Sequence, residues 1–383
     1  MPRLLPLGGL AIFMVALAVA PIAQPTAGRQ VESVMTEDGP LSANLVVDGF
    51  NHPWGMAFLP DGRLFVTERN TGKLYVVARD GTRSDAIEGT PTVFAEGQGG
   101  LLDVALAPEF AENSHVYLSY AEPGPDGSAA AALGRGRWTG DRIEGFERIF
   151  LQKPWITGPN HFGGRIVFDG DGHILLPLGE RFQFDPAQDL SNHLGKVVRL
   201  NLDGSVPDDN PFVGQDGAEP EIWSYGHRNV IAAALHPETG ELWITEMGPL
   251  GGDELNQPEA GKNYGWPVVS WGINYDGSSI PDPTTRPDFA DAVKYWSPVI
   301  SPSGMIVYTG DAFADWRGNV FIGALSAHQL VRLEMGPDGV AHEERIPLGE
   351  RFRDVEEGPD GSLYVLTDKD NGALWRISPM EVN

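Results

Sequence analysis

A histidine flanked by glycines is the first residue of this sequence that could do chemistry. His161 lies in the stretch 158–165 (GPNHFGGR), directly before the apolar run 166–168. Histidine can take or release a proton near neutral pH, because its ordinary pKa lies there. Glycines beside it allow a backbone segment or a flat ligand to approach closely. The stretch therefore predicts a site, although taken alone it is also typical of a loop histidine that packs or caps.

Three arginines are candidates for binding an anion. The guanidinium groups of Arg228, Arg351 and Arg353 can each form two hydrogen bonds to a carboxylate or phosphate. A polyanionic small molecule would therefore suit them. Ion pairs with the abundant Asp and Glu residues are the purely structural alternative.

An oxygen-rich segment could hold a metal. Residues 246–256 (EMGPLGGDELN), followed by 263–266 (NYGW), combine carboxylates, backbone carbonyls and glycine turns without helical or strand periodicity. This combination suits a Ca²⁺ ion bound by oxygen. The spacing does not match the twelve-residue EF-hand loop, so the pattern by itself leaves the metal open.

A strand–turn–strand pattern that occurs six times must position these residues. Each copy has an apolar strand, a turn with Asp-Gly or a similar pair, and a second apolar and aromatic strand. Repeats of this kind, most of them followed by further strands, predict an all-β fold of the six-bladed β-propeller type, with a β-sandwich as the weaker alternative. The six copies are 55–58 with 64–66, 103–106 with 116–118, 165–168 with 174–176, 231–235 with 242–244, 305–308 with 320–322, and 354–355 with 363–365.

The propeller geometry predicts one functional face. The early strand 44–47 is expected to pair with the last blade and close the ring. In each blade, the start of the first strand and the end of the second lie opposite the Asp-Gly turn, and we expect a ligand site where these loops meet on the axis. The loops that meet there are 52–54, 97–98, 160–161, 227–229, 301–303 and 351–353 at strand starts, and 68–69, 180–181, 246–249 and 368–370 at strand ends.

The composition and the N-terminal residues indicate which classes of binding partner and which cellular compartment to expect. The formal net charge of −26 disfavours nucleic acid and anionic lipid as partners, and the absence of cysteine excludes disulfides and thiolate metal sites. A positive charge at Arg3, an apolar run and then small residues predict a signal peptide with linker over residues 1–27, ahead of a propeller domain over 40–383. We therefore expect a periplasmic or secreted protein without a membrane span after cleavage, with an uncleaved anchor as the alternative.

The loop motifs together resemble the glucose/sorbosone dehydrogenase family, over about residues 45–377. Members of this family are soluble six-bladed propellers that use pyrroloquinoline quinone (PQQ) and calcium, and the chain looks most similar to the PQQ-dependent aldose sugar dehydrogenase branch. The motifs occur in the family's order: 97–103 (GQGGLLD), 160–165 (NHFGGR), 226–229 (GHRN), 248–249 (GP) with 253–256 (DELN), 263–267 (NYGWP), 296–298 (WSP) and 351–355 (RFRDV).

The resemblance implies an oxidation of aldose sugars to lactones. His161 would be the general base that takes the proton of the anomeric hydroxyl while hydride moves to carbon C5 of the quinone. Arg228 would act with it at the quinone edge. The further cofactor contacts implied are Gln98, Asn229, Arg351 and Arg353.

The resemblance also implies two calcium sites and a substrate contact. The backbone carbonyls of Gly248 and Pro249 would ligate the calcium that polarises PQQ, and Glu254 and Tyr264 would ligate a second, structural calcium. Trp296 would stack near the sugar. The electron acceptor is not indicated.

Several positions depart from the glucose dehydrogenase pattern. Asn160 stands where that pattern has Asp before the histidine, and the Asp that orients the base appears here as Glu180. A lysine after the fifth blade's second strand is replaced by Ser326, and a substrate-side tyrosine by Val293. Cofactor affinity and sugar specificity are the properties that these changes affect.

Two other functions fit a propeller with a polar face. A calcium-dependent lactonase would need several acidic and Asn side chains converging on the axis, so that the metal could activate water. A non-catalytic binding propeller would keep the blades but would not require His161, Arg228 and the Arg351/Arg353 pair together.

Overall fold

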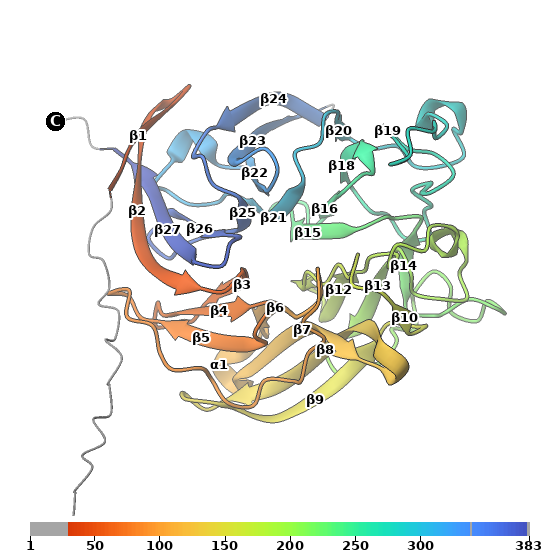
Figure 1. Cartoon of the computed structure of the whole chain (residues 1–383), viewed down its shortest axis with the longest axis horizontal. Coiled ribbons are helices and arrows are strands. Elements are labelled where there is room, and N and C mark those ends of the chain that lie inside the picture. Colours follow the sequence, from red (N-terminus) through yellow and green to blue (C-terminus); the bar gives the residue numbers. More distant parts are fainter. Residues whose placement is uncertain (1–29, 338, 381–383) are drawn as a thin grey trace, which may run out of the picture.

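The chain folds as a ring of antiparallel sheets. The computed structural model describes residues 30–337 and 339–380, so the predicted signal peptide lies outside the described residues. Figure 1 shows six sheets arranged around a common centre, with the first strand of each sheet nearest the middle. This confirms the predicted six-bladed β-propeller. Within the described residues, no helix is long and apolar enough to cross a membrane.

The blades follow one another along the chain. Blade 1 holds β3 (Pro53–Phe58), β4 (Leu64–Glu68) and β5 (Lys73–Val77); blade 2 holds β6 (Leu101–Leu106), β7 (His115–Pro123), β8 (Ser128–Trp138), β9 (Ile143–Leu151) and β10 (Ile156–Thr157). Blade 3 holds β11 (Val167–Phe168), β12 (His173–Pro177), β13 (Lys196–Asn201) and β14 (Ile222–Tyr225); blade 4 holds β15 (Val230–Leu235), β16 (Leu242–Glu246), β18 (Asp253–Asn256) and β20 (Lys294–Trp296). Blade 5 holds β21 (Pro302–Val307), β22 (Val320–Ala324), β23 (Gln329–Gly336) and β24 (Gly339–Ile346).

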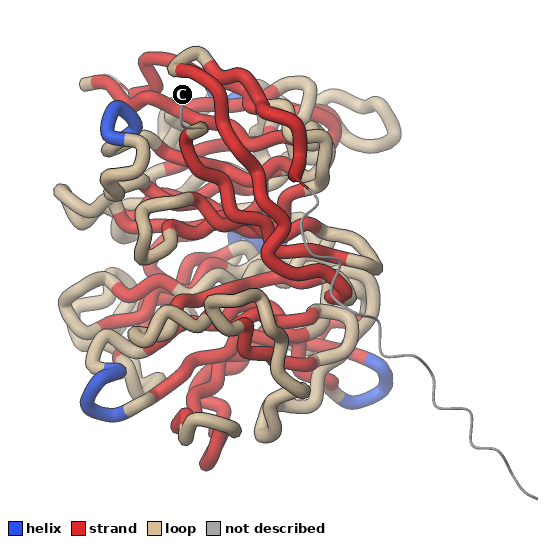
Figure 2. Tube along the Cα trace, turned by 90° about the vertical axis from the view of Figure 1, so that its left-hand side faces the viewer, coloured by secondary structure: helices blue, strands red, loops and turns tan. Residues whose placement is uncertain are grey.

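Blade 6 is built from both ends of the described chain. Its inner strands are β25 (Phe352–Glu357), β26 (Leu363–Thr367) and β27 (Gly372–Pro379), and its outer strands are β2 (Gly39–Phe50) and β1 (Gln30–Thr36). Strand β2 pairs antiparallel with β27, with Asn44 opposite Arg376 and Leu45 opposite Trp375. The predicted closure by strand 44–47 is therefore confirmed, and Figure 2 shows the long outer strands running beside the rest of the ring.

Short helices and one small ribbon lie in the connections. The helical segments are α1 (Phe110–Asn113) and the 3₁₀ turns η1 (Pro125–Gly127), η2 (Asp185–Gln188), η3 (Pro283–Thr285) and η4 (Ala314–Trp316). A two-stranded ribbon joins β17 (Leu250–Gly251), which lies within the segment predicted to bind calcium, to β19 (Gly272–Ile273), which follows that segment.

Apolar side chains fill the spaces between neighbouring blades. Trp54, Leu102, Phe162 and Leu176, from blades 1 to 3 and their loops, pack in one buried cluster. Full burial of a side chain of this size contributes roughly 1.5–3 kcal/mol. Each blade therefore depends on its neighbours for its core, which is why the loops at the axis are held in fixed positions.

A buried ion network ties three blades together near the axis. Arg165 Nη1 lies 3.0 Å from Asp103 Oδ1 of blade 2, and Arg165 Nη2 lies 2.9 Å from Asp354 Oδ1 of blade 6. The guanidinium carbon lies 4.3 Å from the centre of the Trp54 ring. Burial raises the pKa of Asp354 to about 7, against the opposing charge of Arg165. This network packs against Trp54, which also lines a cavity on the axis.

Candidate active site

A cavity of about 330 Å³ opens where the strand-start and strand-end loops meet. All six blades contribute to it, as the propeller geometry predicts. The volume lies at the small end of the range for small-molecule sites. The lining residues are His52, Trp54, Arg69, Gln98, Phe162, Gly163, Asn229, Ile231, Met247, Ser301, Leu325, Arg351, Arg353 and Asp368.

His161 lies beside this cavity and is held by two partners. Its Nδ1 lies 2.6 Å from Glu180 Oε1, and its backbone N–H donates to Gln98 Oε1 at 2.7 Å. The other oxygen of Glu180, Oε2, accepts from the backbone N–H groups of Phe184, at 2.7 Å, and Gln183. A carboxylate whose second oxygen already accepts two hydrogen bonds favours a proton on Nδ1 of the histidine. Nε2 is then the nitrogen with a free lone pair.

The surroundings keep His161 neutral near pH 7. Its side chain is only 6% exposed. Burial lowers the pKa of His161, the positive charge of Arg228 lowers it further, and the hydrogen bond with Glu180 acts in the opposite direction. The unprotonated imidazole is the form that can accept a proton.

Two strained loops hold this pair in place. His161, Arg181, Phe182 and Phe184 have φ between 53° and 64°, a left-handed conformation that side chains other than glycine rarely adopt. Such residues cost about 1–3 kcal/mol each and persist where the surroundings impose them. Arg181 anchors the loop before His161, because its guanidinium donates to the backbone carbonyls of Asn160, at 2.8 Å, and Gly158, and also to that of Ala129 in β8.

Arg228 contacts the segment predicted to bind calcium. Its Nη1 donates to the carbonyl oxygens of Met247, at 2.8 Å, and Gly248, at 2.7 Å, and its Nη2 lies 3.2 Å from the hydroxyl of Tyr275. The next residue, Asn229, lines the cavity with both amide atoms buried and without a hydrogen-bond partner among the described residues. A buried amide without partners normally has a ligand or a water to satisfy it.

Arg351 and Arg353 lie across the cavity, on blade 6. Both approach one carboxylate oxygen, Asp368 Oδ2, with Nη2 at 3.2 Å for Arg351 and 2.8 Å for Arg353. The side chain of Arg351 is 43% exposed, whereas that of Arg353 is 7% exposed. The predicted arginine pair therefore does face the cavity that Gln98 and Asn229 also line.

The oxygen-rich segment places two buried carboxylates close together. Asn256 Nδ2 donates to Glu246 Oε1 and to Glu254 Oε2, both at 3.0 Å. Burial and then the charge of Glu246 raise the pKa of Glu254 well above its ordinary range. Asn256 Oδ1 is buried and has no partner among the described residues. Tyr264 packs nearby, with its ring stacked on His227 at 4.8 Å.

Pro249 and Gly248 form the turn that leads into β17. Gly248 N–H donates to Asp253 Oδ1 at 2.9 Å, while Asp253 Oδ2 accepts from Ser301 N–H at 2.7 Å. Burial raises the pKa of Asp253 to about 6. Asp253 therefore fixes this turn to the loop that carries Ser301 on the cavity wall.

The structure does not bring Trp296 to the cavity. Its side chain is buried at 3% exposure in the core between blades 4 and 5, and its Nε1 donates to Glu343 Oε2 at 3.1 Å. Strand β20 turns the ring toward blade 5, so Trp296 is not among the residues that line the cavity. The aromatic ring beside His161 is that of Phe182, 38% exposed and 5.2 Å from the imidazole, and Tyr275, 60% exposed, stacks on Phe182 at 6.3 Å.

Sequence reasoning gave no role to several cavity residues. His52, Trp54, Arg69 and Asp368 lie in the loops assigned to the functional face, and Arg181 lies in the strand-end pair 180–181. The only sequence feature that pointed to these residues was their position in the repeat, because the residues they contact lie far away in the sequence. Tyr275 follows β19, outside the repeat pattern, and carried no signal.

A second group, of one histidine and two glutamates, does not form a suitable metal-binding site. His193, Glu219 and Glu221 have ligand atoms within 4.8 Å of one another. His193 Nδ1 lies 3.2 Å from the backbone N–H of Lys153 and accepts from it, so Nε2 carries the proton and faces Glu221 Oε2 at 3.3 Å. A protonated nitrogen cannot ligate a metal.

This fold and site define a propeller with a histidine and arginines around one axial cavity, and the chain belongs to the glucose/sorbosone dehydrogenase family. The sequence profile of that family, described as Glucose / Sorbosone dehydrogenase, matches residues 50–376. The aldose sugar dehydrogenase YliI of Escherichia coli (strain K12) is 45% identical over 353 residues, which cover 89% of this chain and 94% of the relative.

Solved structures show the same relationship. The soluble aldose sugar dehydrogenase of Escherichia coli in its apo-form matches with a TM-score of 0.85 and 43% identity, covering 89% of this chain and all of that one. The PQQ-bound form of the aldose sugar dehydrogenase of Streptomyces coelicolor matches with a TM-score of 0.71 and 26% identity, covering 94% of this chain and 100% of that one.

Proposed function

We propose that this protein is a PQQ-dependent aldose sugar dehydrogenase that oxidises the anomeric carbon of a sugar to a lactone. One observation carries the proposal: a buried histidine with a carboxylate partner directly precedes two residues of the cavity wall, Phe162 and Gly163, and a cluster of arginines lines the same cavity. The first can accept a proton and the second can hold an anion. The similar proteins of Escherichia coli and Streptomyces coelicolor support the sugar and the cofactor.

The cavity residues suit a flat anionic cofactor such as PQQ. Arg351 and Arg353 would hold its carboxylates, and Gln98 would contact the quinone edge. The cofactor would also supply hydrogen-bond partners for the buried side-chain amide of Asn229. When bound, PQQ supplies a quinone carbon that accepts hydride. Trp54 forms a flat, buried wall of the same cavity.

His161 would remove the proton from the anomeric hydroxyl. Its Nε2 has the free lone pair, and Glu180 holds the Nδ1 proton and stabilises the imidazolium that forms. Arg228 would place positive charge beside the negative charge that develops. Phe182, whose ring packs on His161, and Tyr275, which stacks on Phe182, are both exposed and would contact the apolar face of the sugar.

The oxygen-rich segment suits calcium at two places. The carbonyl oxygen of Gly248 accepts a hydrogen bond from the guanidinium of Arg228. Together with the carbonyl oxygen of Pro249, it would ligate a calcium ion beside the cofactor. At Glu254 the buried carboxylate lies next to a second carboxylate and to the unpaired Asn256 Oδ1, so an oxygen-liganded cation would balance the charge, with Tyr264 as a further ligand.

We further propose that the protein is exported. A signal peptide with linker over residues 1–27 would precede the propeller domain over 40–383, which gives a periplasmic or secreted enzyme with a separate, unidentified electron acceptor. The lactonase alternative is less well supported, because the described cavity lining holds three arginines and a single carboxylate, Asp368.

The test is reconstitution of the purified chain with PQQ and Ca²⁺, followed by dye reduction with a panel of aldoses. We expect turnover with at least one aldose, and we expect His161→Gln to bind PQQ nearly as tightly as the parent while its rate falls at least about a hundredfold. A parent that binds no PQQ would favour the lactonase or the binding propeller. A His161→Gln variant that keeps most of its activity would refute the proposed base.

A further inference from the structure

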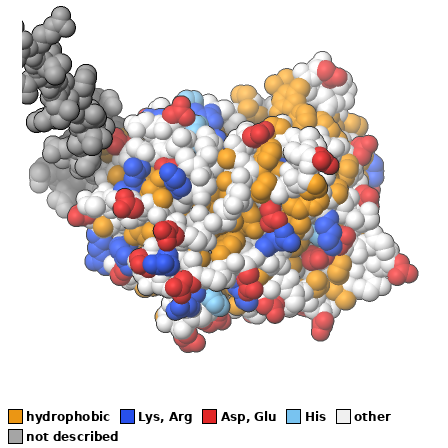
Figure 3. All heavy atoms as spheres, turned by 60° about the horizontal axis from the view of Figure 1, so that its bottom comes forward, with side chains coloured by type: hydrophobic (Ala, Val, Ile, Leu, Met, Phe, Trp, Pro, Cys, Tyr) orange, Lys and Arg blue, Asp and Glu red, His pale blue; other side chains and the backbone are white. Residues whose placement is uncertain are grey.

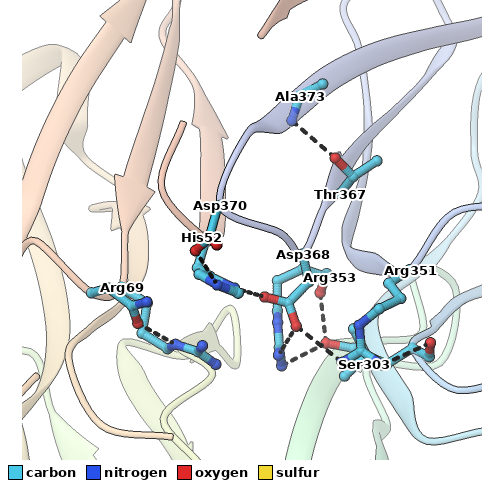
Figure 4. A network of polar contacts seen from close by, with 11 residues as sticks. His52, Arg69, Ser303, Arg351, Arg353, Thr367, Asp368, Asp370 and Ala373 are labelled. Atoms are coloured by element: carbon cyan, nitrogen blue, oxygen red, sulfur yellow. Dashed lines mark hydrogen bonds and ion pairs between the residues drawn. The ribbon is translucent and has the colours of Figure 1, made fainter. Parts of the chain in front are cut away.

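A third arginine lies in the cavity opposite the pair on blade 6. Arg69 directly follows β4 of blade 1 and lines the same cavity as Arg351 and Arg353. Figure 4 shows its side chain extending toward Asp368 and Arg353. Its Nε donates to Asn70 Oδ1 at 3.2 Å, a neighbour in the sequence, and this bond leaves the outer guanidinium nitrogens for other acceptors.

Two of the three arginines contact one carboxylate, and Arg69 lines the same cavity without an ion pair to it among the described residues. Arg351 and Arg353 both contact Asp368 Oδ2, while Asp368 Oδ1 lies 2.8 Å from His52 Nδ1. Burial and then the positive charge of Arg353 lower the pKa of Arg69 to about 10, and Asp368 only partly offsets them. The group therefore carries an excess of positive charge that a bound anion would neutralise.

This positive charge is local. The whole chain has a formal net charge of −26, and on the face drawn in Figure 3 the basic side chains are interspersed with acidic ones. A cluster of three arginines around one acid, recessed in a cavity, contrasts with that background. Recessed clusters of one sign concentrate ligands of the opposite sign.

The backbone of Arg69 is fixed from two sides. Its N–H donates to the carbonyl of His52 at 3.1 Å, and its carbonyl accepts from Leu101 N–H at 3.2 Å. Gly100 makes the second contact possible: its φ is 138°, and a Cβ there would lie 2.0 Å from the Arg69 carbonyl oxygen. The arginine thus starts from a rigid position between blades 1 and 2, which favours binding over a free surface position.

We propose that Arg69 is the third arginine of a carboxylate-binding cluster, and that it orients the ligand with its carboxylates toward blades 1 and 6 and its reacting end toward His161 on blade 3. This inference rests on the proposed function, because PQQ is the polycarboxylate that the cavity would take. Arg69 would act by holding the ligand, not by taking part in the proton transfer.

The experiment measures PQQ affinity in the absence of sugar. Apoprotein with Ca²⁺ is titrated with PQQ and followed by tryptophan fluorescence, for the parent, Arg69→Met, Arg69→Lys and the control Arg63→Met. Arg63 directly precedes β4, at the end of the strand opposite Arg69, and pairs with Asp61. Its substitution therefore makes the same change in net charge, but on the face of the propeller opposite the cavity.

We expect Arg69→Met to raise the Kd for PQQ about ten- to thirtyfold and to flatten its salt dependence, because one charge-assisted contact is lost. Arg69→Lys should recover part of the affinity, and Arg63→Met should stay within about twofold of the parent.

The outcomes separate this inference from the proposed function. If the parent does not bind PQQ, the proposed function fails. If the parent binds and Arg69→Met binds equally well with the same salt dependence, the role of Arg69 is refuted while the function stands. If Arg69→Met does not fold, the neutral variant Arg69→Gln replaces it, and a Kd and salt dependence equal to those of the parent would again refute the role.

Discussion

Replacing Glu180 by Gln should invert the tautomer of His161 and so remove its basicity. Glu180 Oε2 accepts from the backbone N–H groups of Gln183 and Phe184, while Oε1 faces His161 Nδ1 at 2.6 Å. A glutamine side chain has one oxygen and one NH₂ group. If the NH₂ group faced the two backbone N–H groups, two buried donors would be left unpaired, at about 1–3 kcal/mol each.

The glutamine should therefore turn its oxygen toward the backbone and its NH₂ group toward His161 Nδ1. Nδ1 must then accept, the ring proton moves to Nε2, and Nε2 can no longer take a proton from the sugar. Loss of general-base catalysis typically costs a factor of about 10² to 10⁴, which is the decrease in kcat that we expect. Because Glu180 is fully buried and the replacement is nearly isosteric, the fold and PQQ binding should be little changed.

The pH profile distinguishes this effect from a simple pKa shift. Burial lowers the pKa of His161, so the parent should lose activity only as the pH falls below the ordinary histidine value of 6.5 and through the lowered pKa. The activity of Glu180→Gln should not recover at any higher pH, because the tautomer and not the protonation state is wrong. Nitrogen NMR shifts of the His161 ring should show the proton on Nε2.

The matched control is Glu221→Gln, which removes the carboxylate beside another buried histidine, His193, outside the cavity. Its kcat should equal that of the parent. The reasoning is refuted if Glu180→Gln retains activity within about fivefold of the parent, or if activity is lost while the ring proton stays on Nδ1.

Two further predictions concern the metal and the sugar. Because burial and Glu246 raise the pKa of Glu254, the apoprotein should lose stability as the pH rises through that pKa, and Ca²⁺ should raise the melting temperature more at pH 8 than at pH 5. Glu254→Gln should abolish most of this calcium increment in differential scanning fluorimetry, and an unchanged increment would show that calcium binds elsewhere. Phe182→Ala should raise the KM for the best aldose about two- to tenfold without changing the Kd for PQQ. An unchanged KM, equal to that of the exposed control Val213→Ala, would exclude Phe182 from the sugar site.

The blades and their shared face could be predicted because their signals are local. Short apolar runs bounded by turn residues identify strands such as β4 and β16, and Gly-containing turns precede both strands. The need to protect an edge strand predicts the pairing of β2 with β27. These signals also place the loops of His161, Arg228 and Arg351 on one face.

The directions of single side chains could not be predicted in the same way. Trp296 lies within a motif of the face, yet its ring packs between blades 4 and 5 because of the orientation of β20. Arg181 holds the loops at His161 through the carbonyl of Ala129, which lies in another blade. Both facts depend on contacts between segments far apart in the sequence, and a pattern within one segment carries no information about them.

The floor of the cavity and the closure of the ring depend on the same buried ions. Arg165 pairs with Asp103 and Asp354 and packs on Trp54, which lines the cavity. Removing one partner of such a network typically costs about 3–5 kcal/mol, because the others keep a buried charge. The neighbouring strands leave space for these acids only at glycines: a Cβ at Gly55 would lie 2.6 Å from Asp103 Oδ1, and the equivalent atom at Gly304 would lie 2.4 Å from Asp354 Oδ1. A substitution of Arg165, Asp103 or Asp354 should therefore loosen the contacts between blades 2, 3 and 6 and disturb Trp54 in the cavity wall at the same time.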